Sequence, residues 1–303
     1  MDSHSTPVPG KGPASYGESF ADVYDQWYEN VTDANAMARF LAGWFPAPGP
    51  NSEATGRGRV LELGVGTGRL ARPLIDQGFA VWGLDASLSM LRRCRAAVPD
   101  CHLLAADMAN FSLAMRFDVV LVGFNTLFNV ADEPGQKEVF RLAGDHLRPG
   151  GLFVVEAFDP APVAARTIPD GNNSTDGNNS TDGNNSTDGD NSAGGAEDGT
   201  NTNTAPVIES GLSFRSVDQL GVTLISSHSD VAAQTVMGCH WTVADRGVSL
   251  RPWTIRWATR HQLDDWATEA GLILTGRYRD WHGAPYLPGE PGHETHISMY
   301  APV

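Results

Sequence analysis

The sequence predicts an α/β fold with a mostly parallel β-sheet and a smaller antiparallel sheet inserted late in the chain. Short apolar runs alternate with helical stretches in the first half, and such runs suit parallel strands buried on both faces. Beyond about residue 220, longer runs follow one another without a helix between them, as expected for antiparallel strands. The five short runs are Val60 to Leu63, Ala80 to Leu84, His102 to Ala105, Phe117 to Val122 and Leu152 to Val155.

Before the first strand, the chain changes from polar to amphipathic. Residues 1–17 are rich in Pro, Ser and Gly, and we expect them to be disordered. From Glu18 to Phe45, apolar and aromatic residues recur at helical spacing, which predicts two helices. We therefore expect residues 18–160 to form N-terminal helices and the core sheet.

A polar, Gly-rich segment interrupts the second half of the chain. It contains GNNSTD three times in tandem between Gly171 and Gly189. With so little apolar surface to bury, residues 161–205 are expected to form a disordered surface insertion. Calcium binding and glycosylation of the N-x-S/T sequons are alternatives. Calcium β-roll repeats also need a regular large apolar residue, which is absent here, so repeat expansion in a tolerant loop is favoured.

The remaining residues divide into an antiparallel sheet and a C-terminal unit. Residues 206–258 are expected to hold strands over 222–227, 233–243 and 248–258, with a turn at Asp245-Arg246-Gly247. Residues 259–303 begin with a capping box, Thr259 to Gln262, whose helix ends at Gly271. Two final strands are predicted, Leu272 to Tyr278 and Thr295 to Tyr300.

Charge and composition narrow the choice of partners. The formal net charge is -15, and the chain has no basic run. Because phosphate backbones select clustered Lys and Arg, we expect neither nucleic acid nor an anionic membrane as a partner. No segment resembles a signal peptide or a bilayer span, and the three cysteines show no metal spacing, so we expect a cytoplasmic protein with reduced thiols.

Glycines mark the junction between the first strand and its helix. Gly64, Gly66 and Gly68 follow Glu62 at alternate positions, where the backbone must turn tightly and let a ligand approach. Dinucleotide-binding folds favour G-x-G-x-x-G, whereas this segment reads E-x-G-x-G-x-G and has Arg at position 69.

This motif resembles the first motif of class I S-adenosylmethionine-dependent methyltransferases, and further motifs follow in register. These are the acidic end of the second strand, Leu104-Ala-Ala-Asp107-Met108, the run from Phe117 to Asn125, and His146 to Glu156. The resemblance covers about Tyr24 to Ile297. It implies a doubly wound, Rossmann-like, seven-stranded sheet whose last strand is antiparallel, with the small antiparallel sheet inserted after strand five.

The resemblance also implies the cofactor, S-adenosyl-L-methionine, and its site. Asp85, with Ala86 beside it, would bind the ribose hydroxyls, as a carboxylate at the end of a strand can. Asp107 and Met108 would hold the adenine, and the carbonyl of Gly123 would accept the donor ammonium group. Glu62, the three glycines and Tyr24, an aromatic residue closing over the donor, complete the predicted cofactor site.

Candidates for the catalytic or acceptor pocket are fewer. Tyr28 is similar to residues that close such sites, although plain helix packing explains it equally well. Asn125 would lie near the methyl group or cap the following helix. His282 is a candidate base in the loop between the last two strands, and His240 is a candidate in the inserted sheet. His293 and His296 have neither the spacing nor the helix of a zinc motif, so no metal is predicted.

The predicted function is in-line transfer of a methyl group to N or O of a small-molecule acceptor. The inserted sheet is similar to that of methyltransferases acting on small metabolites, including amino-sugar N-methyltransferases of bacterial secondary metabolism. A dedicated base is optional for an amine acceptor. The alternatives are a non-catalytic S-adenosylmethionine-binding protein and an NAD-dependent oxidoreductase. A homodimer through the edge of the inserted sheet is also predicted as an option.

Overall fold

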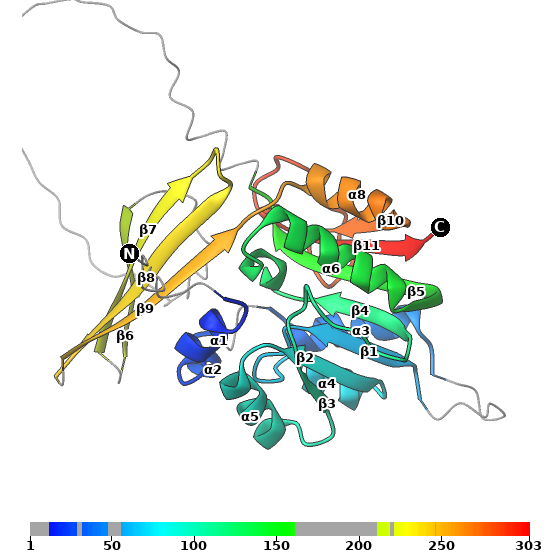
Figure 1. Ribbon diagram of the computed structural model, residues 1–303, viewed down its shortest axis with the longest axis horizontal. Coiled ribbons are helices and arrows are strands. Elements are labelled where there is room, and N and C mark those ends of the chain that lie inside the picture. Colours follow the sequence, from blue (N-terminus) through cyan, green and yellow to red (C-terminus); the bar gives the residue numbers. More distant parts are fainter. Residues whose placement is uncertain (1–11, 29–31, 48–55, 161–210, 219–220, 246) are drawn as a thin grey trace, which may run out of the picture.

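A computed structural model describes residues 12–28, 32–47, 56–160, 211–218, 221–245 and 247–303. Its core is a seven-stranded sheet in the order β10-β11-β5-β4-β1-β2-β3 (Figure 1). All pairs among β1 to β5 are parallel, whereas β11 runs antiparallel to both β5 and β10. The predicted fold class is therefore confirmed. The strands are β1 (Arg59–Leu63), β2 (Ala80–Asp85), β3 (His102–Ala105), β4 (Phe117–Val122), β5 (Leu147–Phe158), β10 (Leu272–Tyr278) and β11 (Thr295–Pro302).

Helices cover both faces of this sheet because the strands alternate apolar side chains between two cores. On one face, Phe153 and Val155 pack with Phe140 of α6 and Trp266 of α8. On the other face, Val154 packs in a core with α3, α4 and α5. The helices are α3 (Ala34–Trp44), α4 (Ala71–Asp76), α5 (Leu88–Ala97), α6 (Glu133–Asp145) and α8 (Arg260–Glu269), with a 3₁₀ turn η1 (Thr126–Asn129) after β4.

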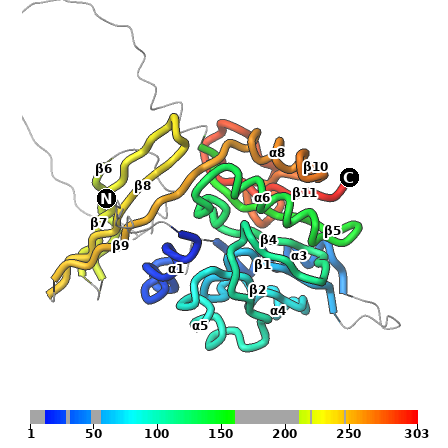
Figure 2. The backbone as a smooth tube through the Cα atoms, viewed as in Figure 1, coloured from blue at the N-terminus to red at the C-terminus, as the bar shows by residue number. Residues whose placement is uncertain are grey.

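The segments on either side of the inserted strands join in one body (Figure 2). β11 pairs with β5 from Thr295↔Phe158 to Tyr300↔Phe153, so the chain returns across the insertion to complete the sheet. α8 begins with the predicted capping box, in which the Thr259 hydroxyl accepts a hydrogen bond from the amide of Gln262. That local cap starts the helix where the chain re-enters the core.

The inserted sheet has four antiparallel strands, one more than the strand pattern predicted. They are β6 (Gly211–Asp218), β7 (Gly221–Asp230), β8 (Thr235–Ala244) and β9 (Gly247–Arg256). The extra strand, β6, has a bulge between Phe214 and Ser216, and this break in the alternation explains why its pattern was not recognised. Arg246, in the predicted turn, lies outside the described residues.

The described part of the N-terminal segment, residues 12–28 and 32–47, has three helices where the sequence predicts two. α1 (Ser15–Phe20) begins before the predicted boundary at residue 18 and is followed by α2 (Tyr24–Tyr28) and α3. Separate hydrogen bonds of Glu18 and Asp25 hold α1 and α2 on the core, and the chain bends between these two anchors. Of the residues 1–17 and 161–205 that are predicted to be disordered, residues 1–11 and 161–205 lie outside the described residues, whereas residues 12–17 are described and include the start of α1.

Candidate functional site

The loop after β1 is shaped by its glycines. Gly64, Gly66 and Gly68 have φ of 77°, 55° and 90°, angles that residues other than glycine rarely adopt. A Cβ on Gly64 would lie 2.3 Å from Cγ2 of Thr126, whereas one on Gly66 would meet nothing within 4 Å. The loop is therefore packed on one side and open at Gly66, where a ligand can approach the backbone.

Asp85 lies at the end of β2 directly beside this loop. Its carboxylate accepts hydrogen bonds from the amide of Gly66 (2.9 Å) and the amide of Ser87 (2.8 Å). Burial raises the pKa of Asp85, while these backbone hydrogen bonds oppose the rise. Ala86 follows immediately and is half-buried. The structure thus brings Gly66, in the loop after β1, next to Asp85 at the end of β2.

Asp107 and Met108 lie just beyond β3. Oδ1 of Asp107 accepts a hydrogen bond from the amide of Ala109 (2.9 Å), which fixes a turn closed by a bridge to Asn110. Cε of Met108 would lie 3.4 Å from a Cβ on Gly64. The turn after β3 therefore places Met108 against the glycine loop, and its predicted contact with the adenine stays a prediction.

A small cavity of about 20 Å³ opens between the glycine loop, α2 and the turn after β4. Two buried polar atoms at this cavity have no hydrogen-bond partner within the described structure, Oε2 of Glu62 and Nε of Arg69. Burial raises the pKa of Glu62 well above its ordinary value, and Cys94 and Asp85 add to that rise while Arg69 opposes it. The lining residues are Tyr24, Glu62, Gly64, Val65, Arg69, Leu70, Gly123, Phe124 and Thr126.

The turn after β4 adopts an unusual backbone. Phe124 and Asn125 have φ of 43° and 57°, a region costly for residues other than glycine. Oδ1 of Asn125 accepts a hydrogen bond from the amide of Phe158 (2.7 Å), and the side chain makes no cap bond to η1. Asn125 therefore ties the turn to β5, and the prediction that its side chain caps the following helix is wrong. Its place near the methyl group stays a prediction. The carbonyl of Gly123 accepts a hydrogen bond from the amide of Thr126 (3.1 Å).

Glu156 of β5 holds the same turn from below. Its Oε2 accepts a hydrogen bond from the amide of Phe124 (2.8 Å), and its Oε1 accepts from Nε1 of Trp281 (3.0 Å) and the hydroxyl of Thr32 (3.2 Å). Arg69 lies over the ring of Phe124, 5.7 Å from its centroid. The sequence interpretation missed this cluster, although an acidic residue near the carboxyl end of a buried strand was a signal for it.

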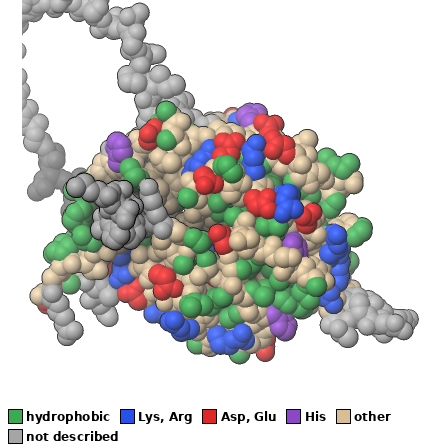
Figure 3. Space-filling view, viewed as in Figure 1, with side chains coloured by type: hydrophobic (Ala, Val, Ile, Leu, Met, Phe, Trp, Pro, Cys, Tyr) green, Lys and Arg blue, Asp and Glu red, His purple; other side chains and the backbone are tan. Residues whose placement is uncertain are grey.

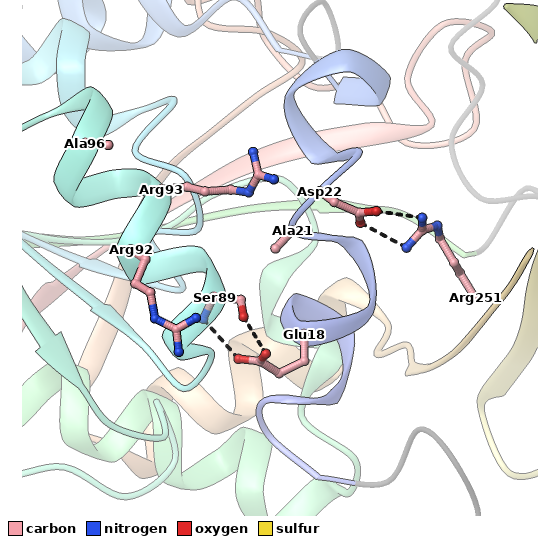
Figure 4. Close-up of a pocket in the computed structure, with 8 residues that line it drawn as sticks. All are labelled: Glu18, Ala21, Asp22, Ser89, Arg92, Arg93, Ala96 and Arg251. Carbon is pink, nitrogen blue, oxygen red and sulfur yellow. Dashed lines mark hydrogen bonds and ion pairs between the residues drawn. The ribbon is translucent and has the colours of Figure 1, made fainter. Parts of the chain in front are cut away.

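The first two helices, α1 and α2, are hydrogen-bonded to the glycine loop and to the segment that follows β2. The hydroxyl of Thr67 donates to Asp25 (2.5 Å), and the hydroxyl of Ser87 donates to Glu18 (2.7 Å). The hydroxyl of Ser89 also donates to Glu18 (Figure 4). These serine hydrogen bonds lower the pKa of Glu18 to about 2. On the outer side, a larger open cavity of about 530 Å³ lies between α1 and α5, away from the glycine loop.

A row of aromatic rings connects α2 with the turn after β4. Tyr24 and Tyr28 lie with ring centroids 4.8 Å apart, and Tyr28 is 6.0 Å from Phe124. The hydroxyl of Tyr16 donates to that of Tyr28 (3.1 Å). Burial raises the pKa of Tyr24 to about 12, so its phenol stays protonated at neutral pH. Both predicted tyrosines therefore lie at the cavity or next to its lining.

The two candidate histidines lie in different places. His240 is buried between the inserted sheet and the first helices, with ring centroids 5.3 Å from Phe20 and 5.1 Å from Trp27. Burial, with Arg215 and Arg251 nearby, lowers its pKa to about 3. His282 has an exposed side chain, and its neighbour Trp281 is the residue of that loop that reaches Glu156. His282 therefore does not join the site as predicted.

His293 and His296 both flank the ring of Tyr286, at 5.7 and 5.5 Å. His293 precedes β11, so strand alternation does not fix the direction of its side chain. Among the described residues, no group of three or more His, Cys, Asp or Glu could hold a metal ion. Nor does any described helix have the length and apolar character to cross a membrane.

Comparisons with known proteins agree with this geometry. The family described as "Methyltransferase domain" matches residues 60–151. A dTDP-3-amino-3,6-dideoxy-α-D-glucopyranose N,N-dimethyltransferase from Streptomyces fradiae is 30% identical over 178 residues, covering 56% of this chain and 68% of that protein.

Solved structures extend the likeness over nearly the whole chain. The CcbJ methyltransferase from Streptomyces caelestis is 28% identical with a TM-score of 0.72, covering 97% of this chain and 100% of that one. S-adenosylmethionine-bound CalS10, an amino pentose methyltransferase from Micromonospora echinaspora, is 18% identical with a TM-score of 0.59, covering 91% and 96%. The second likeness concerns the fold alone.

Proposed function

The chain belongs to the S-adenosylmethionine-dependent methyltransferase family, and from that premise we propose that it methylates the amine nitrogen of a small molecule, with amino sugars as the leading class. The amine is supported by the N,N-dimethyltransferase from Streptomyces fradiae, whose acceptor is a dTDP-linked amino sugar. The observation that carries the donor site is the pair of unpartnered polar atoms at the cavity beside the glycine loop.

These two atoms fit the amino-acid end of S-adenosylmethionine. That end carries an ammonium and a carboxylate, and a buried charge is tolerated only when it is paired. Oε2 of Glu62 would accept from the ammonium, and Nε of Arg69 would donate to the carboxylate. Arg69 is thereby added to the predicted cofactor residues.

The rest of the donor would follow the glycine loop. Asp85 still has lone pairs for ribose hydroxyls after accepting from two backbone amides, and each carboxylate oxygen can accept more than one hydrogen bond. Asp107 has one carboxylate oxygen outside its turn for the adenine amine, with Met108 against the ring. Tyr24 would cover the amino-acid end from α2.

When bound, S-adenosylmethionine supplies a methyl group on a positively charged sulfur that departs neutral. The protein then has to align the acceptor and exclude water. The Phe124-Asn125 turn is fixed by Glu156 and Asn125 and borders the cavity, so we assign it the alignment of the acceptor. Tyr28 would close the same space.

The surroundings of this turn suit an amine acceptor better than a hydroxyl. Glu156 already accepts three hydrogen bonds, Asn125 is bonded to β5, and His282 is exposed, so none of them is placed as a base. An amine delivered in its neutral form needs no base, whereas a hydroxyl gains considerably from one. His240 packs against the ring of Trp27 and would support the wall of the acceptor pocket that α2 forms.

The experiment combines binding and turnover. Calorimetric titration with S-adenosylmethionine, S-adenosylhomocysteine and NAD, on the wild type and Asp85→Ala, tests the donor site. Mass spectrometry of dTDP-amino sugars, matched dTDP-sugars with a hydroxyl in place of the amine, and simple amines tests the acceptor. Methylation of the amino sugars alone would support the proposal. Donor binding without any turnover would favour a non-catalytic binding protein, and methylation of the hydroxyl sugars would refute the amine assignment.

A further inference from the structure

Two successive arginines on α5 have no partner among the described residues. The buried side of this helix carries Met90, Leu91 and Cys94, so positions 92 and 93 between them face outward. Neither Arg92 nor Arg93 makes a hydrogen bond or an ion pair within the part of the chain that the structure describes. Basic side chains lie over α5 at the bottom of the space-filling view (Figure 3). The chain therefore presents two available cations here, although its net charge is -15.

Both arginines line the open cavity of about 530 Å³ between α1 and α5, which we call the outer cavity. Figure 4 shows their side chains extending from α5 toward α1. Arg251 of β9 adds a third guanidinium group from a distant part of the sequence. Arginines on an ordinary solvated helix face have no such surrounding walls. The lining residues are Glu18, Ala21, Asp22, Ser89, Arg92, Arg93, Ala96 and Arg251.

The two carboxylates of the outer cavity are already bonded within the protein. Glu18 accepts hydrogen bonds from the hydroxyl of Ser87 (2.7 Å) and from the hydroxyl and amide of Ser89 (2.6 and 3.0 Å). Asp22 accepts from both terminal nitrogens of Arg251 (2.9 and 2.8 Å). The carboxylates thus do not neutralise the guanidinium groups on α5, which stay available to an anion.

The chemistry and the size of the outer cavity fit a phosphorylated small molecule. A guanidinium group can donate two parallel hydrogen bonds to phosphate oxygens. The volume lies in the range of about 300–1,000 Å³ that is typical of small-molecule sites, so it has room for an organic part beside the phosphate. Ala21 and Ala96 supply apolar surface for that part. At physiological salt, the repulsion of an anion by distant acidic residues is screened beyond ~8 Å.

We propose that the outer cavity binds a small phosphorylated metabolite and that its occupation strengthens the binding of S-adenosylmethionine. The ligand would contact α1 at Ala21 and α5 at Arg92 and Arg93, so it would bind most tightly where α1 is docked on α5. α2 directly follows α1, and its Tyr24 lines the cavity beside the glycine loop. A ligand that prefers the docked arrangement shifts the protein toward it and thereby favours the covered donor site. The coupling rests on the proposed donor site, whereas the phosphate site does not.

Calorimetric titration of the full chain with pyrophosphate, glucose 6-phosphate and glucose tests the phosphate site. Arg92→Gln and Arg93→Gln remove the two available cations. Arg39→Gln is the matched control, because Arg39 is an exposed arginine on α3 that also makes no hydrogen bond or ion pair within the described residues. We expect both phosphates, but not glucose, to bind the wild type and the control. Each α5 substitution should raise their dissociation constants about tenfold.

Three results would overturn the phosphate site. They are no binding of either phosphate, binding that neither α5 substitution weakens, and an equal weakening by Arg39→Gln. The last result would show that only the net charge of the chain matters.

Titration with S-adenosylmethionine, with and without saturating pyrophosphate, tests the coupling. Pyrophosphate should tighten donor binding about fivefold in the wild type and in Arg39→Gln, and it should have little effect at the same concentration in Arg93→Gln. Because coupling is reciprocal, S-adenosylmethionine should tighten pyrophosphate binding by the same factor. A donor affinity that pyrophosphate leaves unchanged would refute the coupling. A chain that binds pyrophosphate through the α5 arginines but never binds S-adenosylmethionine would refute the donor site and support the phosphate site.

Discussion

The buried ring of His240 should lower the stability of this protein in acid, and a single substitution tests this effect. Its ring is 4% exposed between the inserted sheet and the first helices, and neither ring nitrogen has a hydrogen-bond partner in the described structure. Burial and two nearby arginines lower its pKa from 6.5 to about 3. The unfolded chain therefore takes up a proton at His240 below about pH 6.5, whereas the folded chain does so only near pH 3. Lowering the pH between these values stabilises the unfolded state.

The magnitude follows from these two pKa values. At pH 7 the difference in proton binding costs the fold almost nothing, whereas at pH 5 it costs about 2 kcal/mol. His296, fully buried with its pKa also lowered to about 3, adds a similar loss. We predict that His240→Phe keeps the ring packing and removes about half of this histidine contribution. Urea unfolding at pH 7 and pH 5 measures it.

Comparing His240→Phe with the wild type isolates the contribution of His240 to the pH dependence of unfolding, because the carboxylates titrate in the same way in both proteins. The loss of unfolding free energy from pH 7 to pH 5 should be about 2 kcal/mol smaller in His240→Phe than in the wild type. His282→Phe, which changes an exposed histidine, should lose as much as the wild type. An unchanged pH dependence in His240→Phe would refute the argument that His240 is buried in its neutral form.

Three further predictions concern the donor site. Asp85→Asn should weaken S-adenosylmethionine binding about 30-fold by calorimetry, because hydrogen bonds to a charged group contribute about 2 kcal/mol, while the exposed Asp76→Asn should bind like the wild type. Donor affinity should rise with pH above 4.5, because burial raises the pKa of Glu62 and the donor ammonium selects its ionised form. Glu62→Gln should bind with little pH dependence, and a wild-type affinity that falls with pH would contradict this pairing. Glu156→Gln should lower kcat about tenfold with little change in the dissociation constant of the donor, because the substitution loosens the Phe124 turn that aligns the acceptor. A selective loss of donor binding would instead show that the turn serves the cofactor.

Local patterns determined the architecture and the cofactor loop. Strands buried on both faces read as continuous apolar runs, and the capping box at Thr259 was visible in four residues. The glycines and Asp85 could be predicted as cofactor residues because the chemistry expected of them depends on neighbours in sequence and on the shared carboxyl edge of parallel strands. Asp85 and the Gly66 amide are accordingly found 2.9 Å apart.

Tertiary structure decided what depends on contacts between distant segments. Glu156, Trp281 and Thr32 meet around the turn after β4 although more than 120 residues separate Glu156 from each of the others. No local pattern distinguishes Trp281 from its neighbour His282, and only the packing of that loop turns the first inward and leaves the second exposed. The same holds for the inserted sheet, because sequence alternation shows that a strand has two different faces but not which one the first helices cover.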